Sequence, residues 1–194
     1  MRTACLLLIL LVAAPCWAQE PRKKIPLDAP TKWGGETLRL PPGFAKDMTL
    51  RGVEHIRFAP GMMKADSDTF FCYALVLELE GSPVLSKDAL HDELLKYYRG
   101  LCTAVMRDKS LDTSDFSLKI TQDTSEKSIR GKRYLGLLDW IEPFATKKRQ
   151  QLNLEIQSWK RADQTFVFLC ASPKGKDAAI WRELRKIRDG YLEN

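Results

Sequence analysis

Alternation of apolar and polar residues in the second half of the chain restricts its possible folds more than any other feature. Segments 116–120, 135–141 and 152–158 all carry this pattern. Successive side chains of a strand point to opposite faces of a sheet, so a period of two predicts strands. Residues 165–171 form a continuous apolar run after a short polar stretch, which predicts a buried strand paired with the preceding one as a hairpin.

Three further strands are expected in the first half of the chain. Segment 36–40 ends at Pro41-Pro42-Gly43, and segment 53–58 ends near Pro60-Gly61. Proline lacks the backbone N–H that a strand ladder requires, so both segments should stop there. Segment 69–79 is apolar on both faces and rich in aromatic residues, which favours a central strand.

Two amphipathic helices complete the pattern. Ser86 is a plausible N-cap for a helix that ends near Asp108, and Gly100 within it indicates close packing against the sheet. A second helix should follow Asp177. The apolar positions of the two helices recur every three or four residues: Leu90, Leu94, Tyr98, Leu101 and Val105 in the first, and Ile180, Leu184, Ile187 and Tyr191 in the second.

These elements predict an α+β fold, a mainly antiparallel sheet of about six strands packed by two helices in an αβ sandwich. A doubly wound parallel sheet would require a helix after nearly every strand, which the sequence lacks. The chain has 194 residues, enough for one substantial core, so we expect a single domain over residues 33–194.

The amino terminus has the pattern of a secretory signal peptide over residues 1–18. Arg2 precedes an apolar stretch that is too short to cross a bilayer, and small residues occupy the positions before cleavage after Ala18. Lipidation at Cys16 is the alternative, although Pro15 fits it poorly. Residues 19–32 are polar and punctuated by proline, which predicts a flexible leader. We therefore expect a secreted or periplasmic protein without a membrane span.

Cleavage after Ala18 would leave three of the five cysteines, Cys72, Cys102 and Cys170, in an oxidising compartment. An odd number permits at most one internal disulfide. Each lies in an apolar setting, which raises the pKa of a thiol and makes it a poor nucleophile. Both buried thiols and one disulfide with a remaining thiol are compatible with the sequence.

Candidate catalytic groups are few. His55 shares a predicted strand face with Arg57, whereas Glu54 points to the opposite face. His91 flanks the first helix, and Asp139 is read as a structural carboxylate on the face of Leu135. The sequence contains no nucleophile elbow, phosphate-binding loop, dinucleotide motif or zinc-ligand spacing, so we expect neither a cofactor nor a metal.

The second helix carries four candidate binding residues, which should face water: Arg182, Arg185, Lys186 and Arg188. The chain has a formal net charge of +6, which favours acidic partners such as an acidic glycan, an anionic surface or an acidic protein. It contains no specific nucleic-acid motif. The alternative interpretation of these cations is a solvated helix face.

Two resemblances can be stated. The stretches WGGE at 33–36, LPPGF at 40–44 and GVEHIRFAPG at 52–61 resemble an uncharacterised family of secreted bacterial proteins. The later order of strands ending in TFVFLCASP, followed by a helix bearing Trp181, resembles the αβα sandwich of the PsbP/Mog1-like group. That resemblance implies a noncatalytic accessory or binding protein and carries over no functional residue.

The sequence therefore predicts a noncatalytic secreted or periplasmic binding or accessory domain of unknown ligand. The alternative is a hydrolase-like enzyme in which folding brings a carboxylate to His55, because catalytic triads are assembled in space and can escape a sequence search.

Overall fold

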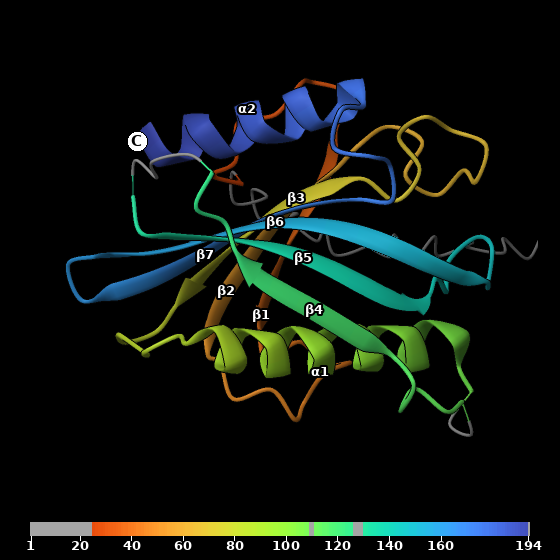
Figure 1. Cartoon of the computed structure of the whole chain (residues 1–194), viewed down its shortest axis with the longest axis horizontal. Coiled ribbons are helices and arrows are strands. Elements are labelled where there is room, and N and C mark those ends of the chain that lie inside the picture. Colours follow the sequence, from red (N-terminus) through yellow and green to blue (C-terminus); the bar gives the residue numbers. More distant parts are fainter. Residues whose placement is uncertain (1–24, 109–110, 126–129, 194) are drawn as a thin grey trace, which may run out of the picture.

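A computed structural model describes residues 25–108, 111–125 and 130–193. In this part of the chain, seven antiparallel strands form one sheet in the order β1-β2-β3-β7-β6-β5-β4. The strands are β1 (Gly34–Leu40), β2 (Gly52–Phe58), β3 (Tyr73–Leu79), β4 (Ser117–Gln122), β5 (Lys132–Ile141), β6 (Arg149–Arg161) and β7 (Gln164–Ser172). The helices α1 (Lys87–Met106) and α2 (Ala179–Glu193) lie on opposite faces of the sheet (Figure 1).

The predicted fold class is confirmed. The sheet was expected to have about six strands, and it has seven, because each of the seven candidate segments contributes one. The expected hairpin is β6–β7, which pairs from Asn153 with Ser172 to Arg161 with Gln164. The predicted N-cap of α1 is also confirmed, because the Ser86 hydroxyl accepts a hydrogen bond from the backbone N–H of Ala89 at 3.0 Å.

The face of the sheet that packs against α1 carries the larger apolar core. Its aromatic side chains cluster where α1 crosses the strands: Tyr98 and Phe71 both pack against Trp140, with ring centroids 5.2 Å apart in each pair. Gly100 packs closely, as expected, but against the loop before β2 rather than the sheet. A Cβ at Gly100 would collide with the carbonyl oxygen of Phe44.

The opposite face is covered by α2 over only part of its width. Trp181, Leu184 and Ile187 are buried against β7 and β3. Figure 1 shows α2 above the strands while β4 and the outer part of β5 extend away beneath it. Because α2 packs mainly on β7 and β3, the helix itself does not cover β4 and β5 on this face.

Two expectations require correction. In β5, Tyr134, Leu138 and Trp140 face the core. The prediction from the sequence that Leu135 and Asp139 lie on the core face was wrong. The described part of the predicted flexible leader is packed, because Leu27 is fully buried in the core beneath α2 and its carbonyl accepts a hydrogen bond from Arg57 Nε at 3.0 Å.

Candidate functional site: a polar cleft beside α2

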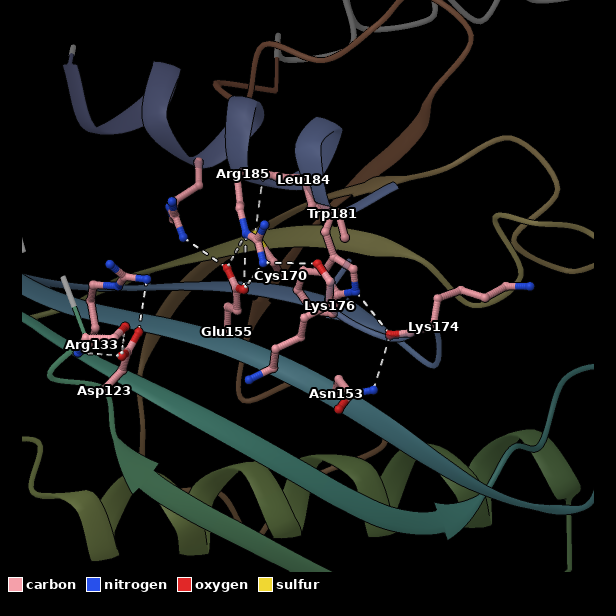
Figure 2. Close-up of polar contacts among 12 residues, drawn as sticks. Asp123, Arg133, Asn153, Glu155, Cys170, Lys174, Lys176, Trp181, Leu184 and Arg185 are labelled. Atoms are coloured by element: carbon pink, nitrogen blue, oxygen red, sulfur yellow. Dashed lines mark hydrogen bonds and ion pairs between the residues drawn. The ribbon is translucent and has the colours of Figure 1, made fainter. Parts of the chain in front are cut away.

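A cleft of about 250 Å³ lies along the side of α2, between the helix and the neighbouring part of the sheet. Strands β5 and β6 form its floor, since Leu135 of β5 pairs with Glu155 of β6 and both line the cleft. The charged side chains that line it are Asp123, Arg133, Glu155, Lys176, Arg185 and Arg188. Figure 2 shows that the labelled members of this set come from the sheet, from α2 and from the loop that precedes α2.

Glu155 forms the centre of the first charged group. Arg185 donates to both carboxylate oxygens at 2.6 to 3.1 Å, and Arg188 donates to Oε2 at 3.2 Å. The Glu155 side chain is only 7 % exposed. A carboxylate buried to this extent needs such partners, because its removal from water is costly. The two arginines thereby dock one side of α2 onto β6.

Asp123 and Arg133 form the second group at the neighbouring wall. Arg133 Nη2 lies 3.0 Å from Asp123 Oδ2. The pKa of Asp123 is lowered, first by the hydrogen bond from the Ser125 hydroxyl and further by the Ser125 backbone N–H and the cations Arg133 and Lys176. Asp123 is therefore ionised at neutral pH, with its charge matched by Arg133.

Lys176 supplies the excess positive charge. Among the described residues, no carboxylate lies within 4.0 Å of its ammonium. The described charged residues that line the cleft are four cations and two carboxylates. Arg188 Nε also lies 2.8 Å from Oδ1 of Asp189, a further carboxylate, so the excess among these described residues is one positive charge. Most of the charged side chains that surround this excess are partly buried, with 5 to 35 % exposure, so it attracts an anion more strongly than the same charge does on an open surface.

The loop that carries Lys176 is fixed by three contacts. The carbonyl oxygen of Lys174 accepts hydrogen bonds from the indole of Trp181 at 3.1 Å and from the amide of Asn153 at 3.2 Å. Arg185 donates to the carbonyl oxygen of Lys176 at 3.4 Å. Figure 2 shows these contacts on the α2 side of the sheet. The backbone that presents the ammonium is therefore preorganised.

The four cations proposed from the sequence do not form one patch. Arg185 and Arg188 turn toward Glu155 and line the cleft, whereas Arg182 and Lys186 are exposed along the other flank of α2. That flank borders a wider groove of about 980 Å³, where Arg182, Arg185 and Lys186 are outnumbered by four carboxylates. The acidic members are Asp28, Glu183, Asp189 and Glu193. This charge balance does not favour an anion.

His55 shares a hydrogen bond of 2.9 Å with the Thr37 hydroxyl, and its Nε2 lies 3.9 Å from Glu78 Oε1. Glu78 also accepts a hydrogen bond from Tyr191 at 2.8 Å. His55 lines neither the cleft, the wide groove nor the small apolar cavity beneath α1. Folding has brought a hydroxyl and a carboxylate to the imidazole on a strand face. The hydrogen bond from Tyr191 to Glu78 joins the end of α2 to β3 at the same place.

The cysteines are buried free thiols in the described structure. Burial raises the pKa of the Cys72 and Cys102 thiols to about 11 each, and it raises that of Cys170 as well. Ionisation at neutral pH is therefore strongly disfavoured, and none of the three is activated as a nucleophile.

Other predicted residues lie outside the cleft. His91 contacts Asp92 on the exposed side of α1 at 2.8 Å, and Asp139 pairs with Arg149 at the far end of β5. In the described residues, no group of three or more His, Cys, Asp or Glu side chains is placed to hold a metal ion. None of the described helices has both the length and the apolar character needed to cross a bilayer.

Sequence reasoning missed the residues that build the cleft: Asp123, Arg133, Glu155 and Lys176. Glu155 lies between two apolar residues, a pattern that predicts an outward polar position on a strand. Its arginine partners lie about thirty residues later in the chain, on α2. The sequence contains no short motif that joins them. Comparison with protein families, curated proteins and solved structures finds no significant match.

Proposed function

We propose that this chain is a noncatalytic binding domain that takes an anionic ligand in the cleft between α2 and the sheet. The observation that carries the proposal is the Lys176 ammonium, which has no carboxylate within 4.0 Å among the described residues and is carried by a fixed loop. The other cations of the cleft are already paired, Arg133 with Asp123, and Arg185 and Arg188 with Glu155 and Asp189. An added anion supplies the missing partner without breaking either existing pair.

The arrangement supports binding better than hydrolysis. Both carboxylates of the cleft are paired with arginines, so they are engaged rather than available as general acids or bases. His55 lies in none of the three hollows described above. From the signal pattern of residues 1–18, we further propose that the domain works outside the cytoplasm.

The test is a titration with acetate and inorganic phosphate, followed by NMR at low and high salt. We expect Lys176→Gln to weaken binding about ten-fold, because a hydrogen bond to a charged group contributes about 1.5 kcal/mol or more. The matched control is Lys186→Gln, on the exposed flank of α2, which should bind as the unmodified protein does. Equal affinity in all three proteins would overturn the proposal.

A further inference from the structure

An exposed leucine continues the floor of the cleft along β5. Among the described residues, the large apolar side chains with substantial exposure are Met63, Val84 and Leu137, and only Leu137 lies on a strand. Leu137 is 37 % exposed, and Leu135, two residues earlier on the same face, lines the cleft. Residues i and i+2 of a strand are about 7 Å apart. A short apolar strip therefore leads out of a positively charged recess.

The neighbours of the strip in the described sheet are polar. On the β4 side, Lys119 lies opposite Leu137 and Thr121 lies opposite Leu135. On the β6 side, Asn153 lies opposite Leu137 and supports the loop of Lys174 through its side-chain amide. Because α2 packs over β3 and β7, it does not cover this part of β5. A ligand can therefore contact the leucines from solvent.

We infer that the ligand of this cleft is an amphipathic small acid, with its acid group beside Lys176 and its hydrocarbon body over Leu135 and Leu137. This inference rests on the proposed anion-binding function and adds the chemical class of the ligand. The charge of the cleft selects an anionic head, and the 250 Å³ volume limits what enters it to that head and a few carbon atoms. The strip outside the cleft then provides about 7 Å of apolar contact for the remainder.

The experiment compares straight-chain carboxylates, acetate, butanoate and hexanoate, with the neutral probe hexan-1-ol, by NMR titration of the full chain. A fully buried methylene raises affinity about four-fold, so contact on one side should raise it about two-fold per methylene. Hexanoate is therefore expected to bind on the order of ten-fold more tightly than acetate, and more tightly than hexan-1-ol.

Two pairs of variants test the contacts of the acid group and those of the hydrocarbon body separately. Leu137→Ser should remove most of the gain with chain length, whereas Val84→Ser, at an 85 % exposed apolar residue of a loop, should retain it. Lys176→Gln should weaken all three acids and leave hexan-1-ol unchanged, whereas Lys186→Gln should change neither.

The results distinguish the two proposals. Equal binding of acetate and hexanoate, with Lys176→Gln still impaired, would overturn the amphipathic ligand and leave anion binding intact. Equal binding of hexanoate and hexan-1-ol, insensitive to Lys176→Gln, would overturn both. Retention of the chain-length gain in Leu137→Ser would overturn the assignment of the apolar strip.

Discussion

Glu54 offers a quantitative test of the packing between α1 and the sheet. Its side chain is fully buried on the α1 face of β2, where Oε1 accepts a hydrogen bond from the Tyr97 hydroxyl at 2.9 Å and Oε2 has no hydrogen-bond partner among the described residues. Burial raises the pKa of Glu54 from 4.5 to about 7; the Tyr97 hydrogen bond opposes this shift and the charge of Glu36 adds to it.

This shift makes the stability of the protein depend on pH. Between pH 4.5 and 7 the unfolded chain loses the Glu54 proton while the folded protein retains it, so the contribution of Glu54 to the free energy of unfolding falls as pH rises. Above pH 7 the folded protein must hold a buried carboxylate. One pKa unit corresponds to about 1.4 kcal/mol, so the total loss is roughly 3 kcal/mol.

Glu54→Gln removes the titrating group and keeps its shape. We expect the variant to be close to the unmodified protein at pH 4.5 and to become more stable relative to it by roughly 3 kcal/mol at pH 8. Urea unfolding followed by tryptophan fluorescence measures this difference. Glu80→Gln, at an exposed carboxylate after β3, is the control and should follow the unmodified protein. A stability difference between Glu54→Gln and the unmodified protein that stays constant from pH 4.5 to 8 would contradict the raised pKa of Glu54.

Three further predictions concern stability and reactivity. Glu142→Ala should lower the free energy of unfolding by about 3 kcal/mol, because the buried carboxylate accepts hydrogen bonds from Phe144, Ala145 and Thr146; a loss below about 1 kcal/mol in urea unfolding would contradict this. His55→Ala should leave acid binding unchanged and lower stability by about 1 kcal/mol or less, as NMR titration and urea unfolding can show; loss of binding in a folded variant would return His55 to the site. In protein lacking residues 1–18, the cysteines should react with a thiol reagent only after denaturation, and fast alkylation of a native thiol would show that an activated cysteine exists.

The sequence predicts where the helices and strands lie better than it predicts which face of each strand is buried. Ser86 and the spacing of Leu184 and Ile187 identify the helices, because capping and the apolar stripe are local properties. In β5 both faces are apolar, so alternation alone could not decide between the set of Leu135 and that of Trp140. The structure buries the set that contains the larger aromatic residues.

The cleft was harder to predict than the fold, because its residues meet only through sheet register and helix docking. Arg185 was identified as a basic residue, but its alignment with Glu155 depends on how α2 crosses β6. Lys176 lies in a loop whose path is set by Asn153 and Trp181. None of these contacts follows from spacing along the chain.

The most direct measurement of the central proposal is a map of backbone amide chemical shifts during titration with phosphate. Anion binding in the cleft should produce saturable changes confined to Ser125, Arg133, Glu155 and the loop around Lys176, with affinity that falls as salt is added. Shifts concentrated along the outer flank of α2 near Arg182 and Lys186, or no saturable shifts at the cleft, would contradict it.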